Sequence, residues 1–275
     1  MFDIMIVHVL LGLVLISYAY AENPLYILPE QGSGNWKVCL VVNTVPVSNL
    51  SDVRSDIQVN GIYFVNSCVQ WQIFSPEEAK TILLPFIQTH LTPNAIIQIL
   101  GDPTDSLKDV ADPLLTALVN HQFSSIALGY YGPISEDFVS AQIPTGQVSD
   151  LTLAGSWPNG AAPQVKTYLT QTPKPRLTLS KDNQMHIDVD LFTTMMDMFV
   201  NNKLVYLRGM FGQLELAPKD LAALHPDLQS HGAIKPRVPG FPVFAWKTPA
   251  YPKLYFIVQF YENQVEVYTF YRRRG

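Results

Sequence analysis

Short apolar–x–apolar segments recur along the middle of the chain at nearly regular intervals. The six segments are Trp71–Ile73, Ile97–Ile99, Ile126–Leu128, Leu151–Leu153, Leu177–Leu179 and Val205–Leu207. Their starting positions are 26, 29, 25, 26 and 28 residues apart. Alternating apolar residues over so few positions are typical of strands that bury one face. Because the interval is close to constant, the pattern predicts stacked repeats that each supply one strand.

Between these strands the apolar residues recur three and four positions apart, which predicts amphipathic helices. The first helix begins at Ser75, a side-chain cap followed by Pro76 and two acidic residues, and it extends to His90. Further helices are predicted over residues 106–121, 135–142, 161–170, 188–202 and 217–224.

The alternation of strand and helix predicts an α/β fold of leucine-rich-repeat-like build, with a parallel sheet and a layer of helices. An ordinary α/β sheet is the alternative, because the intervals are not identical. The chain is expected to divide into an N-terminal cap segment over 22–60, a repeat-like α/β domain over 61–228, and a proline-rich loop with a C-terminal β-hairpin over 229–275. The hairpin strands are predicted over Lys253–Tyr261 and Val265–Arg272. Both faces of this hairpin are apolar, so its second face is either buried or a partner surface.

The beginning of the chain has the pattern of a secretory signal. Residues 4–18 form an apolar run, and Ala19-Tyr20-Ala21 supplies small residues where a signal peptidase cleaves. We therefore expect residues 1–21 to be a signal peptide and the mature chain to be secreted or lumenal, with no membrane association. No basic residue precedes the run, so a membrane anchor over residues 4–21 and an incorrectly assigned first exon are the alternatives.

The two cysteines and one glycosylation sequon fit an oxidising compartment. Cys39 and Cys68 are the only cysteines, and one disulfide between them is the simplest arrangement. Two buried thiols are the alternative. Asn49 begins the tripeptide Asn49-Leu50-Ser51, a glycosylation sequon in a secreted chain.

Composition excludes some classes of function. The chain has 275 residues, 48% of them hydrophobic and 15% charged, with a formal net charge of −5. This hydrophobic content predicts a folded chain, and the negative charge argues against a nucleic-acid partner. The run Arg272–Arg274 at the end of the chain is interpreted as a solvated terminus.

No catalytic, cofactor or metal site is predicted. The chain has neither a G-x-S-x-G elbow nor a phosphate-binding glycine loop. His90 and His121 fall at predicted helix ends, where histidine commonly bonds free carbonyls. The metal-like alternation over His186–Asp190 is better explained by an aspartate that caps the next helix. The carboxylates of Gly101–Ser106 are interpreted as turn and cap residues, with Asp105 or Ser106 as the cap.

Three of the strand segments also carry a family resemblance. The segments Ser125–Leu128, Ser149–Leu153 and Arg176–Leu179, each with its following helix, resemble the FTH-type domain that follows the F-box in many nematode proteins. The resemblance implies a partner-recruiting role. No F-box precedes the repeats in this chain, so an intracellular F-box adaptor with a wrong N-terminus is an alternative.

Three aromatic residues are the candidate contacts for a partner. Tyr130, Tyr131 and Trp157 follow the third and fourth strands at similar offsets, and in stacked repeats they would gather on one edge. The alternative is that they fold back onto the strand ends. The sequence thus predicts a secreted or lumenal, non-enzymatic scaffold that binds an unidentified protein. A hydrolase with an unrecognised site is the rival from another class.

Overall fold

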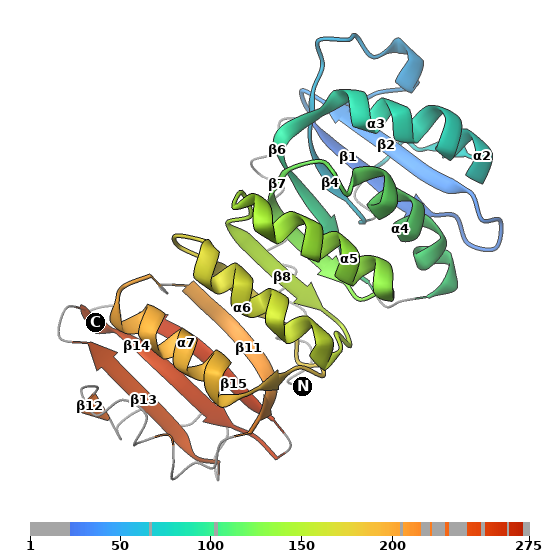
Figure 1. The fold of residues 1–275 in the computed structure, drawn as a ribbon. Coiled ribbons are helices and arrows are strands. Elements are labelled where there is room, and N and C mark those ends of the chain that lie inside the picture. The colour runs from blue at the N-terminus through green and yellow to red at the C-terminus, as the bar shows by residue number, and fades with distance from the viewer. Residues whose placement is uncertain are drawn as a thin grey trace. The chain divides into compact units, whose positions relative to one another are not determined.

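The computed structural model describes most of the chain after residue 22 (Figure 1). The described residues are 23–65, 68–101, 104–203, 206–215, 221, 229–230, 241–248, 251–262 and 264–271. The predicted signal peptide over 1–21, nearly all of the predicted helix over 217–224, most of the proline-rich loop and Arg272–Arg274 lie outside them. The chain forms two compact units, residues 1–123 and 124–275. The boundary between these units falls inside the predicted domain over 61–228.

The first unit is built on a mixed sheet in the order β6-β4-β1-β2. Its strands are β1 Pro24–Pro29, β2 Trp36–Val42, β3 Val45–Pro46, β4 Val59–Tyr63, β5 Gln72–Phe74 and β6 Leu91–Ile99. Strands β6, β4 and β1 are parallel, whereas β2 is antiparallel to β1, β3 and β5. The strand predicted at Trp71–Ile73 is therefore an antiparallel neighbour of β2. Within the first unit β6 pairs in parallel with β4, where Ile62 lies beside Ile97.

The helices of the first unit lie on one face of this sheet (Figure 1). They are α2 Pro76–Glu78, a π-helical turn over Ala79–Leu83, α3 Leu84–His90 and α4 Asp105–Leu118, and a short 3-10 turn spans Leu50–Asp52. The predicted cap is confirmed, because Ser75 and Glu78 form a reciprocal capping box. Pro85 has no N–H to donate to the preceding turn, and the π-turn before it accommodates that missing bond.

The second unit contains the parallel strands that the repeat pattern predicts. Strands β7 Phe123–Gly129, β8 Asp150–Ala154, β9 Arg176–Leu179 and β11 Tyr206–Leu214 lie side by side. Matching positions of the pattern share rows across the sheet, as in the row Ile126, Leu151, Leu177, Leu207. All four residues of this row are at most 1% exposed. The short strand β10 His186–Ile187 pairs with the far end of β11.

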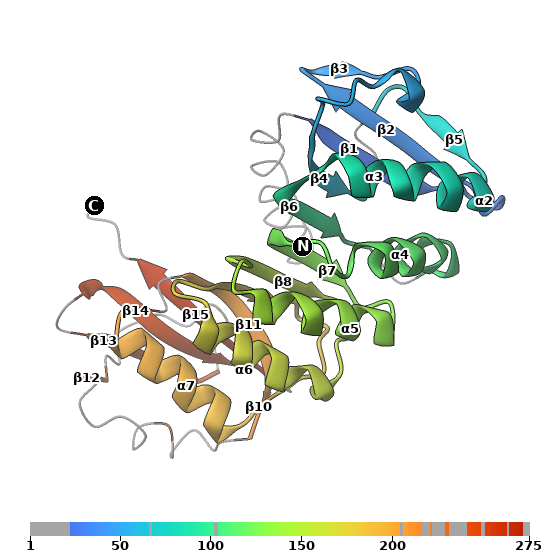
Figure 2. The same ribbon diagram turned by 45° about the horizontal axis from the view of Figure 1, so that its top comes forward.

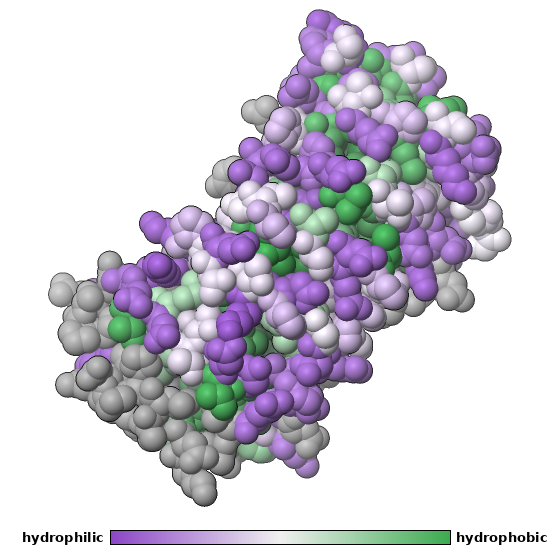
Figure 3. Space-filling model, in the orientation of Figure 1, coloured by the Kyte–Doolittle hydropathy of each residue, from purple (hydrophilic) through white to green (hydrophobic). Residues whose placement is uncertain are grey.

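Helices α5 Pro133–Gln142, α6 Ala162–Gln171 and α7 Val189–Val200 cover one face of this second sheet (Figure 2). Short 3-10 turns over Ile143–Thr145 and Asn159–Ala161 accompany them. Hydrophilic side chains predominate over these helices on the side seen in Figure 3. The buried leucines of the strands face the helices. Alternate strand positions such as Ala127, Thr152 and Thr178 are half-buried on the opposite face.

The predicted C-terminal hairpin is confirmed as β14 Tyr251–Phe260 and β15 Val265–Tyr271, which pair antiparallel. Strand β15 also pairs with β11, and β13 Val243–Thr248 and β12 Gln229–Ser230 extend the antiparallel set. Phe256 packs against Phe192 and Phe199 of α7. On the other face Ile257 and Tyr268 are also buried. The fold is thus mixed α/β with an antiparallel C-terminal set.

Candidate functional site

The predicted aromatic contacts do not form an exposed surface. Tyr131 is 2% exposed and Trp157 is 0% exposed, so neither side chain faces solvent. Trp157 Nε1 donates a hydrogen bond of 3.4 Å to the carbonyl of Leu128. The Trp157 and Tyr130 rings pack with centroids 5.4 Å apart. The loops after β7 and β8 therefore return over the strand ends, which was the alternative reading of these residues.

Tyr130 is the half-buried member of the three. Its hydroxyl donates a 2.9 Å hydrogen bond to Glu136 Oε1, from the first turn of α5. Burial, the bond to Glu136 and the charge of that carboxylate all raise the pKa of Tyr130. The loop before α5 is held by Ser135, whose Oγ accepts from the Tyr131 backbone N–H at 3.0 Å and donates to the Gly129 carbonyl at 3.3 Å. A partner role for Tyr130 remains a prediction.

A second group of side chains, which the sequence pattern did not single out as a site, lies on the face opposite α5–α7. Asp150, Arg176 and Tyr206 occupy one row at the amino ends of β8, β9 and β11. Arg176 Nη1 lies 3.8 Å from Asp150 Oδ2, and the Arg176 guanidinium carbon lies 5.1 Å from the centroid of the Tyr206 ring. This is cation–π geometry. The Arg176 side chain is 47% exposed and Tyr206 is 53% exposed.

In this group, the Arg176–Tyr206 cluster, the carboxylate of Asp150 lies near two guanidinium groups. Partial burial raises the pKa of Asp150, while the nearby guanidinium groups of Arg208 and Arg176 oppose that increase. The Tyr168 hydroxyl, from α6, lies 2.9 Å from the carbonyl oxygens of Ser149 and Arg176 and ties the two strands together. The backbone that carries Arg176 is therefore fixed on the helix side of the sheet.

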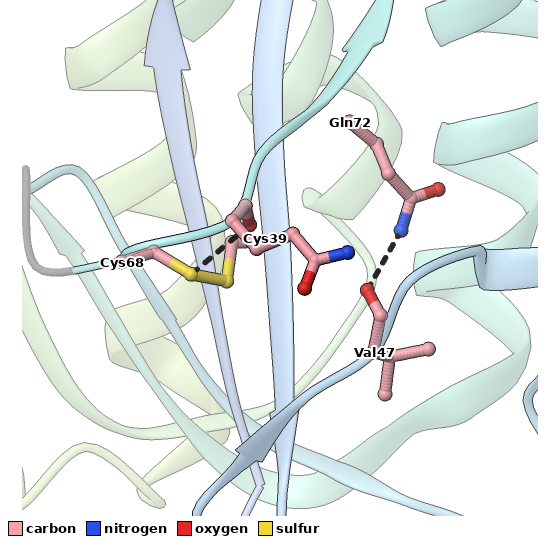
Figure 4. Close-up of a disulfide and its surroundings, with 5 residues drawn as sticks. Cys39, Val47, Cys68 and Gln72 are labelled. Carbon is pink, nitrogen blue, oxygen red and sulfur yellow. Dashed lines mark hydrogen bonds between the residues drawn. A yellow bond between two sulfur atoms is a disulfide. The ribbon is translucent and has the colours of Figure 1, made fainter.

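A third feature is the disulfide of the first unit (Figure 4). Cys39 of β2 is bonded to Cys68, with their Cα atoms 6.3 Å apart. Tyr26, Cys39 and Tyr63 form a separate buried cluster, and Val65, Cys68 and Trp71 pack over it. These positions alternate with the strand residues that face the helices, so the chain around Cys68 covers the other face of the sheet. Burial and the neighbouring Tyr26 raise the pKa of Tyr63 to about 12.

The segment after the disulfide is tied to a neighbouring loop. Gln72 Nε2 donates to the Val47 carbonyl at 3.2 Å (Figure 4), and Gln72 Oε1 accepts from the Leu50 backbone N–H at 3.0 Å. The adjacent Asn49 is exposed and caps the 3-10 turn, because its Oδ1 accepts from the Ser51 N–H at 3.1 Å. The amide nitrogen that would carry a glycan therefore belongs to an exposed side chain. Glycosylation of Asn49 remains a prediction.

Among the described residues, three histidines contact main-chain or carboxylate oxygens. His90 Nδ1 lies 2.9 Å from the Phe86 carbonyl in the last turn of α3. His121 Nε2 lies 2.9 Å from the Thr92 carbonyl. His186 Nδ1 lies 3.0 Å from Glu215 Oε1, with both side chains solvent-exposed. The contact of His90 matches the helix-end role expected for it. His121 was expected to have the same role, but its ring contacts a carbonyl of strand β6 instead.

The aspartates with metal-like spacing act in other ways. Asp188 caps α7, and its Oδ1 accepts from the Leu191 N–H at 2.7 Å. Asp190 pairs with Lys166 at the surface. The cap of α4 is Thr104, which corrects the expectation of Asp105 or Ser106. Within the described residues, no group of three or more His, Cys, Asp or Glu side chains could hold a metal ion.

Comparison of the chain with protein-family models, with curated proteins and with solved structures finds no match in any of the three. Among the described residues, no helix combines the length and the apolar character needed to cross a membrane.

Proposed function

We propose that this chain is a secreted or lumenal, non-enzymatic scaffold that binds another protein through the Arg176–Tyr206 cluster. The observation that carries the proposal is an exposed aromatic ring stacked on an exposed guanidinium. Tyrosine and arginine supply most of the energy in many protein interfaces, and a tyrosine ordered in advance loses little entropy on binding. The partner surface therefore lies opposite the helices, away from the loops of Tyr131 and Trp157.

The composition of the opposite face supports this choice of surface. Between the charged row and the far ends of the strands, half-buried positions of this face carry the small residues Ala127, Thr152 and Thr178. Small side chains on parallel strands in register leave a shallow surface that a partner chain can approach closely. The leucine-rich-repeat-like build belongs to this proposal, as does the partner-recruiting role implied by the FTH-type resemblance.

The chemistry of the cluster indicates an acidic partner. Arg176 and Arg208 carry two positive charges against the one negative charge of Asp150. The Arg176 guanidinium lies over the face of the Tyr206 ring. A carboxylate of the partner could form a bidentate bond with either guanidinium. The secretory location is supported by the disulfide Cys39–Cys68, because structural disulfides persist in oxidising compartments.

The proposal is tested by comparing matched surface variants of the secreted chain. The wild type, Arg176→Glu and Tyr206→Ser are cross-linked to extracellular proteins in conditioned medium, and the products are quantified by mass spectrometry. Arg54→Glu is the control, because Arg54 is an exposed arginine with one exposed partner, Asp56, in the other unit. We expect a defined partner whose yield falls at least about tenfold in both cluster variants and not in the control. Equal yields from all four proteins would contradict the proposal.

A further inference from the structure

A hollow on the first unit lies far along the sequence from the Arg176–Tyr206 cluster. It is open to solvent, has a volume of about 430 Å³ and is lined by Leu28, Pro29, Glu30, Gln31, Lys37 and Trp71. Ligand sites commonly have volumes of about 300–1,000 Å³ and combine an apolar surface with a few polar groups. The lining has both, since an indole and two aliphatic residues stand beside a carboxylate, an amide and an ammonium group.

Trp71 is held rigidly at the wall of this hollow. One side of the residue packs against the buried cluster of Tyr26, Cys39 and Tyr63. The disulfide from Cys39 to Cys68 fixes the chain three residues before Trp71. The indole is half-buried and already ordered in the folded chain. Little side-chain entropy is therefore lost when a ligand binds to it.

The carboxylate of the hollow is also ordered. Glu30 Oε2 accepts hydrogen bonds from Ser33 Oγ at 2.7 Å and from Asn35 Nδ2 at 3.0 Å. These bonds, with a smaller contribution from Lys37, hold the pKa of Glu30 below its usual value, so the carboxylate is ionised at neutral pH. On the adjacent strand Lys37 lies opposite Leu28. The hollow therefore contains one fixed negative charge and one positive charge.

This pairing of charges selects the class of ligand. A cation would meet the ammonium of Lys37, and an anion would meet the carboxylate of Glu30. A neutral hydroxylated molecule satisfies both, because each hydroxyl can donate to Glu30 and accept from Lys37 or Gln31. Its apolar C–H face would cover the indole of Trp71. From this geometry we infer that the hollow binds a pyranose sugar residue of a glycan, stacked on Trp71 and hydrogen-bonded to Glu30, Gln31 and Lys37.

The test uses the full secreted chain carrying Asn49→Gln, so that its own sequon adds no sugar signal. Saturation-transfer NMR is recorded with methyl glycosides of glucose, galactose, mannose and N-acetylglucosamine. We expect transfer to ring C–H protons of at least one glycoside. Trp71→Ala should weaken its binding about 30-fold and Gln31→Ala about fivefold. Tyr206→Ser, an exposed aromatic on the second unit, should bind as the parent does.

Folding of each variant is checked by circular dichroism and by the mass of the oxidised chain. If Trp71→Ala does not fold, Gln31→Ala and Lys37→Met carry the test, since both residues line the hollow. A second arm presents the same sugar on a glycoprotein, and binding must disappear when the glycan is removed enzymatically. A folded parent that gives no transfer from any glycoside would overturn the inference. So would unchanged binding in Trp71→Ala and Gln31→Ala.

Discussion

Removal of the disulfide should destabilise the first unit by a predictable amount. Cys39 and Cys68 are separated by 29 residues, and the chain-entropy model gives about 3.6 kcal/mol for closing a loop of that length. Alanine at both positions keeps the buried site of Cys39 apolar, so the main change is in the unfolded chain. With a urea dependence of about 1–3 kcal/mol per molar, the unfolding midpoint should fall by at least about 1 M.

The assay is urea unfolding read by hydrogen exchange of peptides from β1 and β2, with peptides from β8 and β9 measured in the same samples. The wild type in dithiothreitol should unfold at the midpoint of Cys39→Ala/Cys68→Ala. The double variant itself should not respond to the reductant. A double variant whose β1–β2 peptides open at the wild-type midpoint would refute the reasoning, because the disulfide would then contribute nothing to the stability of this unit.

Three further outcomes follow from the described contacts. Trp157→Ala should cost about 3–5 kcal/mol of unfolding free energy as a buried aromatic, and a melting temperature equal to that of the wild type would contradict its burial. Asp188→Ala should lower the free energy of unfolding by about 1 kcal/mol, because the cap of α7 is lost. If Zn²⁺ stabilised the wild type and not this variant, Asp188 would instead be a metal ligand. The pKa of Tyr63 is about 12 in the folded chain and about 10 in the unfolded chain. Its contribution to the free energy of unfolding is therefore complete below pH 10 and is lost as the pH rises toward 12. Urea midpoints between pH 9 and 11.5 should fall more steeply in the wild type than in Tyr63→Phe, because the shift in pKa corresponds to about 2–3 kcal/mol of unfolding free energy. Parallel plots of midpoint against pH would contradict the assignment.

The strands of the second unit could be predicted because their signal is local. Leu151 and Leu153 alternate with polar residues and bury one face, whichever strands lie beside them. The choice of neighbour is not local. The segment Trp71–Ile73 has the same pattern, but the strand formed there, β5, pairs antiparallel with β2. Strand β4 was not predicted, because Gly61 interrupts its apolar alternation and the ring of Tyr63 fills the space that a side chain at Gly61 would need.

The candidate sites depended on distances that the sequence does not contain. Tyr131 and Trp157 look like exposed loop residues, since tyrosine and tryptophan occur both in cores and at interfaces. Their burial follows from loops that turn back over the strand ends. Arg176 and Tyr206 are 30 positions apart in the numbering and meet only because β9 and β11 pair in register. The cysteine pair was predictable, because two cysteines permit one bridge.

The secretory scaffold is tested most directly by the intact mass of the chain expressed in a secreting eukaryotic cell, with and without reduction and deglycosylation. The account predicts a species in the medium that begins at Glu22, gains two hydrogens on reduction, and loses mass at Asn49 when its glycan is removed. A species retained in the cell, with Met1 present and both thiols free, would contradict it.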